Sequence, residues 1–117
     1  MFDFNEYQRQ FPNDGDKAET AGSHLHLSLS RFRHIPRLIC ADGFEMSAQA
    51  SEFHHCFPAV TDAAFYDTVE VGFPSEAQEE LMPFIEGDDD KPTETVYDDV
   101  PVAIINALVN KHGGLKV

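Results

Sequence analysis

The dipeptide Asp42-Gly43 lies between two short apolar runs and predicts a β-hairpin. Both central residues of a two-residue type I′ turn need positive φ, which glycine adopts freely and aspartate tolerates. Such a loop pairs Ala41 with Phe44 and Ile39 with Met46. Because side chains alternate along a strand, one face of the hairpin is expected to be apolar. That face would contain Ile39, Ala41, Phe44, Met46 and Ala48.

Two other segments alternate apolar and polar residues, as half-buried strands do. Residues 23–30 carry three leucines at every second position. Residues 66–73 carry Val69, Val71 and Phe73 in the same rhythm. A further short strand is expected within residues 93–97.

Two helices are expected beyond the hairpin. In the first, Ser75 can cap, Gln78 completes a capping box, and Pro83 ends or kinks the helix. The second has Pro101 in its first turn and Gly113 as a left-handed stop. Its expected buried stripe is Val102, Ile105, Leu108 and Val109.

These elements predict an α+β fold: a small antiparallel sheet of three to four strands with two helices packed on one face. Residues 23–117 are expected to form a single α+β domain, and residues 1–22 an N-terminal arm. The arm contains four aromatic residues, of which Tyr7 and Phe11 can share a helical face. Two interpretations stay open: the arm packs loosely on the domain, or it is flexible and orders on a partner.

The charge of the chain restricts its partners. It has 21 acidic and eight basic residues, a formal net charge of −13. Such a charge repels nucleic acid and anionic membranes and favours basic partners. No signal-peptide pattern or membrane-length apolar run is evident, so a cytoplasmic location is expected. Cys40 and Cys56 form no disulfide framework and are expected to stay reduced.

Acidic residues are concentrated in the second half of the chain. Thirteen carboxylates lie between Asp62 and Asp99, where Lys91 is the only basic residue. On a helix, Glu76, Glu79 and Glu80 would lie about 5–6 Å apart, comparable to phosphates repeating at about 3.4 Å per strand. The expected partner-binding acidic face comprises Asp67, Glu70, Glu76, Glu79, Glu80, Glu86, Asp88, Asp89, Asp90, Asp98 and Asp99. The alternative is a solvated face that aids solubility.

The histidines are weaker candidates for chemistry. His24 and His26 would project to one face of a strand, and His54-His55-Cys56 adds further possible zinc ligands. No second Cys or His stands at zinc-finger spacing, so no metal ligands and no cofactor are predicted. A Cys56–His55 nucleophile and base is disfavoured, because neighbours on an extended chain rarely point at each other. No phosphate-binding loop, serine elbow or paired-carboxylate motif is present, so no catalytic residues and no enzyme activity are expected.

Several motifs follow one another in order within residues 37–115. They are Cys40-Ala-Asp-Gly-Phe-Glu-Met-Ser-Ala-Gln-Ala-Ser51, Val69-Glu-Val-Gly-Phe-Pro-Ser75, Glu80-Leu-Met-Pro83, Thr95-Val-Tyr97 and Val100-Pro-Val102 through Lys111-His-Gly-Gly114. In these motifs the chain resembles small uncharacterised accessory proteins of tailed bacteriophages and prophages. The resemblance implies a phage-encoded protein acting in the bacterial cytoplasm. It implies no catalytic residue or cofactor.

Three functions remain open from the sequence. The preferred one is a non-enzymatic, DNA-mimic-like inhibitor that binds a basic surface of a host defence complex, such as a CRISPR effector or a restriction enzyme. The second is a phage accessory or assembly protein acting through protein–protein contacts or self-association. The third is a metal-dependent enzyme that uses the histidines. Either a monomer or a homodimer is compatible with the sequence, and direct binding to nucleic acid or membrane is not expected.

Overall fold

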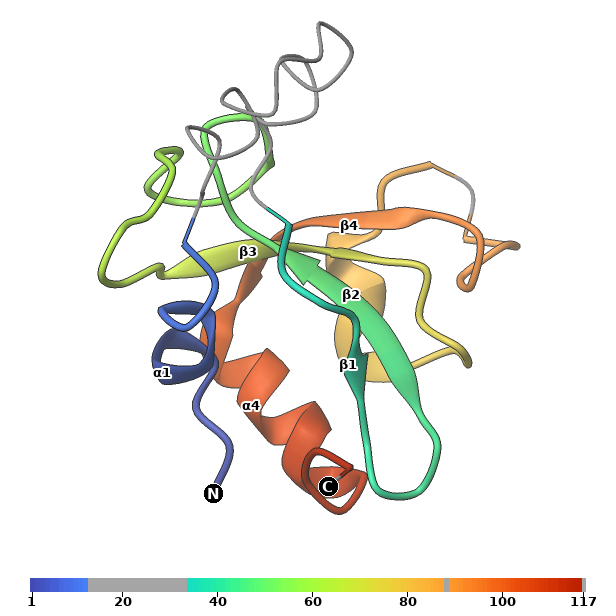
Figure 1. The fold of residues 1–117 in the computed structure, drawn as a ribbon. Coiled ribbons are helices and arrows are strands. Elements are labelled where there is room, and N and C mark those ends of the chain that lie inside the picture. Colours follow the sequence, from blue (N-terminus) through green and yellow to red (C-terminus); the bar gives the residue numbers. More distant parts are fainter. Residues whose placement is uncertain (13–33, 88, 117) are drawn as a thin grey trace, which may run out of the picture.

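The computed structural model describes residues 1–12, 34–87 and 89–116 (Figure 1). The predicted strand at 23–30, with His24 and His26, lies outside the described residues, as does Asp88. The described elements are α1 (Phe4–Gln8), β1 (Leu38–Ile39), β2 (Glu45–Gln49), β3 (Thr68–Gly72), the 3-10 helix η1 (Glu79–Phe84), β4 (Val96–Pro101) and α4 (Val102–Lys111).

The strands form one four-stranded sheet in the order β1-β2-β3-β4, with every neighbouring pair antiparallel. Helix α4 and η1 pack together on one face of this sheet, and α1 lies beside α4 (Figure 1). The predicted α+β class, with an antiparallel sheet and helices on one face, is confirmed. No helix among the described residues is long and apolar enough to cross a membrane.

The core lies between the sheet and α4. On β3, Val69 and Val71 are fully buried, while Thr68 and Glu70 are half-buried. The four residues predicted as the buried stripe of α4 are all buried. The helix ends as predicted, with Gly113 in the left-handed region at φ 91°. One apolar cluster joins hairpin, sheet and helix, and it contains Phe44, Met46, Val71, Ile105 and Leu108.

The hairpin register differs from the prediction by one residue on its first strand. Leu38 pairs with Met46 and Ile39 with Glu45, so Leu38 is buried and Ile39 is exposed. The loop has three residues, 41–43, closed by a hydrogen bond from the Cys40 N–H to the Phe44 carbonyl (2.8 Å). Gly43 takes φ 97° as the last loop residue, the position that a three-residue hairpin loop reserves for glycine.

This register corrects the predicted face. Ile39 and Ala41 are exposed, and Cys40 is buried in place of Ala41. The second strand is unaffected, because Phe44, Met46 and Ala48 are buried as predicted. A slip of one residue moves a whole strand face to the other side of the sheet, so one wrong loop length was enough to invert the first strand.

The predicted helix at 75–83 is also wrong. Ser75 does not cap a helix; its Oγ accepts a hydrogen bond from the Glu45 N–H (3.0 Å), and its own N–H donates to the Glu45 carbonyl (2.8 Å). The segment therefore continues along β2, and only a 3-10 helix forms from Glu79. Glu76 precedes this helix, so Glu76, Glu79 and Glu80 are not i, i+3 and i+4 neighbours on an α-helix. Phe73, predicted to be buried, is exposed at φ 49°.

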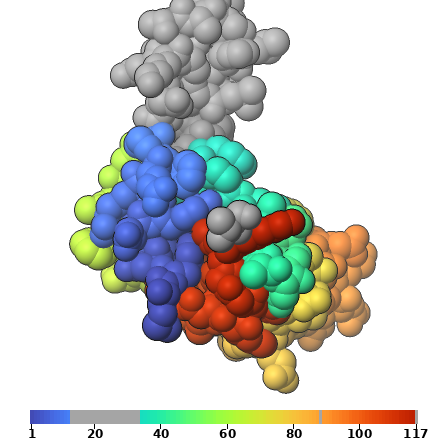
Figure 2. All heavy atoms as spheres, turned by 60° about the horizontal axis from the view of Figure 1, so that its bottom comes forward, coloured from blue at the N-terminus to red at the C-terminus, as the bar shows by residue number. Residues whose placement is uncertain are grey.

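The described part of the N-terminal arm packs against the domain. Asp3 caps α1 by accepting from the Asn5 N–H (2.9 Å), and Phe4 is fully buried. Asn5 pairs with the backbone of Tyr66, accepting from its N–H (2.7 Å) and donating to its carbonyl (3.0 Å). Figure 2 shows these first residues lying against the C-terminal helix α4. The predicted arm boundary at residue 22 lies outside the described residues.

Candidate functional site

A β-bulge between β3 and β4 shapes the face of the sheet that lies opposite α4. Val69 pairs with Val100 and Val71 with Tyr97, so Asp98 and Asp99 together oppose the single residue Glu70. Asp99 takes φ 52°, a left-handed conformation that aspartate tolerates better than most residues. Bulges of this kind re-aim side chains. Here the bulge brings the Asp98 carboxylate to the same face as that of Glu70.

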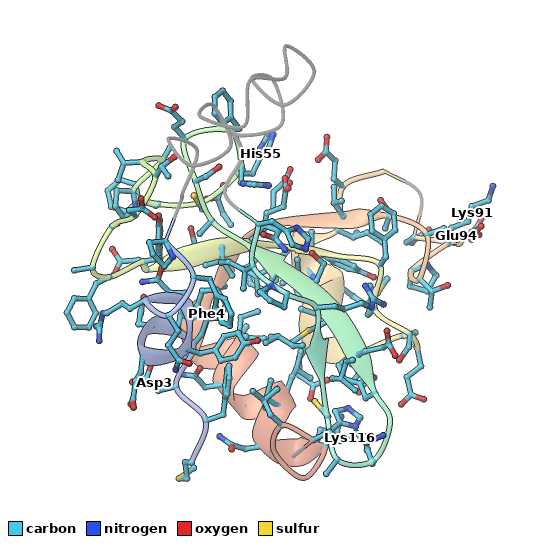
Figure 3. The ribbon with its side chains drawn as sticks, viewed as in Figure 1. Asp3, Phe4, His55, Lys91, Glu94 and Lys116 are labelled. Carbon is cyan, nitrogen blue, oxygen red and sulfur yellow. The ribbon has the colours of Figure 1, made fainter. Side chains whose placement is uncertain are left out.

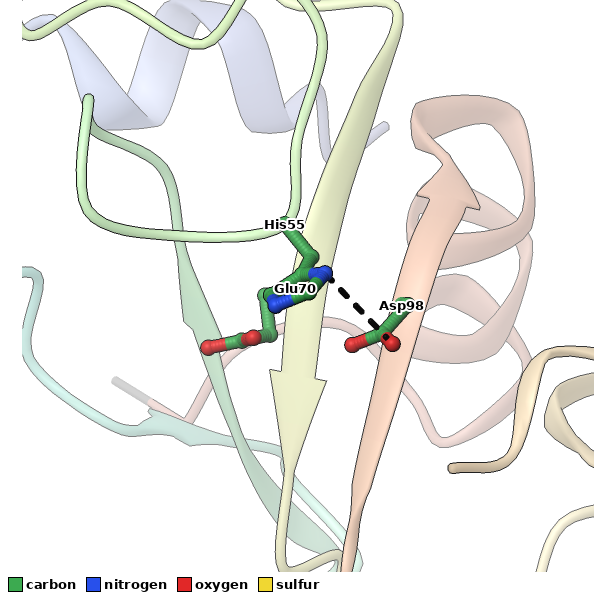
Figure 4. Close-up of side chains that lie close together, drawn as sticks. All are labelled: His55, Glu70 and Asp98. Atoms are coloured by element: carbon green, nitrogen blue, oxygen red, sulfur yellow. Dashed lines mark ion pairs between the residues drawn. The ribbon is translucent and has the colours of Figure 1, made fainter. Parts of the chain in front are cut away.

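The chain between β2 and β3 crosses this face and delivers His55. The Asp99 N–H donates to the His55 carbonyl (3.0 Å), so the residue with positive φ also fixes the loop. The Phe57 N–H donates to the Thr68 carbonyl (3.2 Å), which adds a contact to β3. Figure 3 shows His55 on the side of the sheet away from α4, and Figure 4 shows its imidazole between Glu70 and Asp98.

His55, Glu70 and Asp98 form a cluster of three possible ligands. One ligand atom from each residue lies within 4.8 Å of the other two. The His55 Nδ1 atom is 3.6 Å from Asp98 Oδ2, and the two side chains are 60% and 28% exposed. The Oδ1 atom of Asp98 is buried and has no hydrogen-bond partner among the described residues. The cluster therefore combines an accessible imidazole with an unsatisfied carboxylate oxygen.

Glu86 brings another carboxyl to the cluster. Asp98 raises the pKa of Glu86, first through hydrogen bonding between the two carboxyl groups and then through its charge. His55 acts in the opposite direction on the same group. Burial lowers the pKa of the neighbouring His54, whose Nδ1 lies 2.6 Å from the Ser51 Oγ. Carboxyl groups are thus crowded on this face, and a cation would relieve their repulsion.

The predicted acidic face divides into two groups. The first follows β3, β4 and the connections that lead into them, and we call it the β4 acidic surface: Asp67, Glu70, Glu86, Asp89, Asp90, Asp98 and Asp99. The second group is Glu76, Glu79 and Glu80, on and before η1, which packs on the α4 side of the sheet. Glu80 there pairs with Lys111 (3.1 Å). Asp88, the last predicted member, lies outside the described residues.

The β4 acidic surface is poorly neutralised. Among the described residues, its one ion pair is that between His55 and Asp98. Arg37 forms its ion pair with Glu45 (2.6 Å), which is outside this surface. Lys91 is exposed on the connection into β4 (Figure 3). The surface therefore keeps most of its negative charge in the folded protein.

The sequence pattern associated His55 with the wrong possible ligand partners. It grouped this residue with His54 and Cys56, but Cys56 is buried and its Sγ donates to the Ser51 carbonyl (3.3 Å). The combination of His55 with Glu70 and Asp98 was missed, because it depends on a bulge that no turn signal marks. The pair Asp98-Asp99 opposite an acidic strand residue was the available hint.

Comparison with known proteins gives no identification. No protein-family model, no curated protein and no solved structure matches this chain.

Proposed function

We propose that this chain is a non-enzymatic acidic protein that binds a basic surface of a nucleic-acid-handling protein. Its expected target is a host defence complex of the CRISPR or restriction type, in the bacterial cytoplasm, as the resemblance to phage accessory proteins implies. One observation carries the proposal: the β4 acidic surface holds seven carboxylates in the folded chain, with a single ion pair to them among the described residues.

The physical argument concerns the energy of crowded charges. Three of the seven carboxylates, Glu70, Asp98 and Asp99, lie on the paired strands β3 and β4 and repel one another, and a partner that presents Arg or Lys side chains relieves that repulsion. A protein that normally binds phosphates offers such side chains in a groove. The acidic protein would compete for that groove without being a nucleic acid. Complementary charge of this kind chiefly increases the association rate, so the competition should weaken in salt.

A simpler account of the same residues is protection of an edge strand. β4 lies at one end of the sheet, and charged residues on an edge strand discourage pairing with other chains. That account predicts no partner and no inhibition. The two accounts therefore differ in a measurable way.

A second function is favoured by a separate feature, the aromatic residues of the β2–β3 connection. Phe57 and Phe65 are 63% and 67% exposed, and Phe53 and Val60 are also exposed. Apolar side chains gathered on one connection are typical of protein–protein contacts. This feature supports the alternative of an accessory protein that acts through assembly or self-association.

The test is a competition assay with purified bacterial CRISPR effectors and restriction enzymes, measuring target-DNA binding and cleavage. The decisive variant carries Asp67→Asn, Asp89→Asn, Asp90→Asn and Asp99→Asn, which removes four charges and leaves His55, Glu70 and Asp98 intact. We expect this variant to inhibit at least about tenfold more weakly than the parent at low salt. Raising the ionic strength should weaken the parent in the same way, since screening at about 0.15 M already acts over roughly 8 Å.

The matched control is Glu6→Gln, Glu52→Gln, Glu76→Gln and Glu79→Gln. It removes the same charge from exposed positions that are not members of the β4 acidic surface. The control should inhibit like the parent. Equal weakening in both variants would mean that net charge alone matters, and no inhibition by the parent would overturn the proposal. The assembly alternative predicts instead that Phe57→Ser with Phe65→Ser abolishes concentration-dependent association in sedimentation velocity.

A further inference from the structure

The geometry points to a divalent metal site formed by His55, Glu70 and Asp98, with Zn²⁺ as the favoured ion. Nothing in the charge argument above requires it, and the site is a different use of part of the same surface. Its ligands come from the β2–β3 connection, from β3 and from β4. A bound ion would therefore join the connection to both strands.

The distances suit coordination after a small adjustment. Zinc binds His nitrogen and carboxylate oxygen at about 2.0–2.2 Å, so two ligand atoms around a tetrahedral ion lie roughly 3.4 Å apart. The His55 Nδ1 and Asp98 Oδ2 atoms are already 3.6 Å apart. The whole set lies within 4.8 Å, and His55 is an exposed side chain that can rotate. Closing the set from this spacing to roughly 3.4 Å requires the ligand atoms to approach one another by at most about 1.4 Å.

The donor types select the ion. One imidazole nitrogen with two carboxylate oxygens is a set that transition ions accept, whereas Mg²⁺ and Ca²⁺ prefer oxygen alone. Zinc stands above Mn²⁺ and Fe²⁺ in the order of affinity for such sites. Three protein ligands leave a fourth position for water.

Two features of the fold favour this arrangement. The bulge turns Asp98 toward Glu70, and its other residue, Asp99, donates its N–H to the His55 carbonyl. The same bulge thus positions two of the three ligands. In addition, Asp98 Oδ1 is buried and accepts no hydrogen bond from an N–H or O–H group of the described residues, and a cation or a shared proton stabilises an oxygen in that state.

The test uses the full chain without an affinity tag, stripped with a chelator, and titrates it with ZnCl₂ by calorimetry. We expect one high-affinity ion per chain and a rise in the melting temperature. Asp98→Asn and His55→Gln should each weaken that affinity by at least about tenfold, since even changes outside the direct ligands cost 10–100-fold. Both substitutions keep side-chain shape or lie at an exposed position, and circular dichroism of the metal-free variants should match the parent.

Two controls separate this site from other histidines. His34→Gln removes an exposed imidazole outside the cluster and should leave the affinity unchanged. His24→Gln with His26→Gln removes the pair that the sequence favoured and should also leave it unchanged. Mn²⁺ should selectively broaden the NMR signals of His55, Glu70 and Asp98. No zinc binding by the parent, parent-like affinity in Asp98→Asn, or loss of binding in the His24/His26 variant would each overturn the assignment.

Failure here is distinguishable from failure of the proposed function. The metal variants change His55 and Asp98, whereas the charge variant changes Asp67, Asp89, Asp90 and Asp99. A protein that inhibits without binding zinc would retain the first proposal and lose the second. One that binds zinc without inhibiting would do the reverse.

Discussion

The Nδ1 atom of His112 lies 2.6 Å from Oδ2 of Asp42, joining the end of α4 to the tip of the hairpin. The opposite ring nitrogen is 3.1 Å from Gln78 Oε1, and the ring stacks on Phe44 with centroids 4.2 Å apart. The His112 side chain is 8% exposed. Both ring nitrogens face side-chain oxygens, so each of them lies within hydrogen-bond distance of a polar group. This contact ties together three segments that are far apart in sequence.

Replacing His112 should therefore destabilise the fold. His112→Ala removes both hydrogen bonds and the stacked ring, and we expect a loss of about 2–3 kcal/mol in the free energy of unfolding. Urea titration followed by circular dichroism measures it. His34→Ala, at an exposed position, is the control and should stay within about 0.5 kcal/mol of the parent. Equal stability of the two variants would contradict the role given to this contact.

The same contact predicts that the free energy of unfolding falls at acid pH. The Phe44 N–H, followed by the hydrogen bond with His112, lowers the pKa of Asp42 below its usual value. A carboxyl whose pKa is lower in the folded state adds stability above its unfolded pKa of about 3.9, and this stability is lost as pH falls through the folded pKa. Asp42→Asn should therefore flatten the decline in unfolding free energy below about pH 4. Asp90→Asn, which removes one exposed charge, should keep the parent's slope.

The sequence determined the core more securely than it determined the connections. The four buried residues and the end of helix α4 were predicted, because its apolar period and its terminal glycine agree; Pro101, predicted in the first turn, instead ends β4 and is the N-cap. Local signals failed where a distant segment competed for the same group. Ser75 had the chemistry of a helix cap, but the backbone of Glu45 at the start of β2 used both its N–H and its hydroxyl. No pattern within residues 74–83 contains that information.

The cluster of His55, Glu70 and Asp98 could not be predicted from the sequence, for a related reason. His55, Glu70 and Asp98 were each singled out as chemically interesting, but in different roles. Their meeting depends on strand register and on a bulge, both of which are set by pairing between β3 and β4. A single inserted residue in a ladder changes which side chains share a face. Neither composition nor charge shows which residues pair across two strands.

Two glycines, Gly43 in the hairpin loop and Gly72 on β3, give a matched pair of predictions. Gly43 has φ 97° and open space where a Cβ would lie, so Gly43→Ala should cost about 1 kcal/mol through backbone conformation alone. Gly72 on β3 has no positive φ, and its Cβ would meet Val96 Cγ1 at an ordinary 3.6 Å. Gly72→Ala should therefore be neutral or slightly stabilising. Thermal unfolding of both variants measures the difference. A larger loss of stability for Gly72→Ala than for Gly43→Ala would contradict the pairing of β3 with β2 and β4.

Two adjacent isoleucines on α4 test the packing of helix on sheet. Ile105 is fully buried in the core cluster, and Ile105→Ala should cost about 2–5 kcal/mol. Ile104 is only partly buried on the same helix, so Ile104→Ala has the same change in helix propensity and a smaller loss. Chemical denaturation gives both values. An Ile105→Ala midpoint equal to that of the parent would mean that α4 does not cover the sheet as described.

The bulge residue Asp99 provides the last prediction. It holds φ 52°, accepts a hydrogen bond from Thr68 Oγ1 (2.9 Å) and donates its N–H to the His55 carbonyl. A β-branched side chain is strongly disfavoured at positive φ, so Asp99→Val should cost about 1–3 kcal/mol. Asp99→Asn tolerates the same backbone and keeps an oxygen for Thr68, so it should stay within about 0.5 kcal/mol of the parent. If the bulge positions His55, the valine variant should also shift the His55 amide resonance, whereas the asparagine variant should leave it in place. Equal stability and equal spectra for the two variants would show that the bulge is not held by this residue.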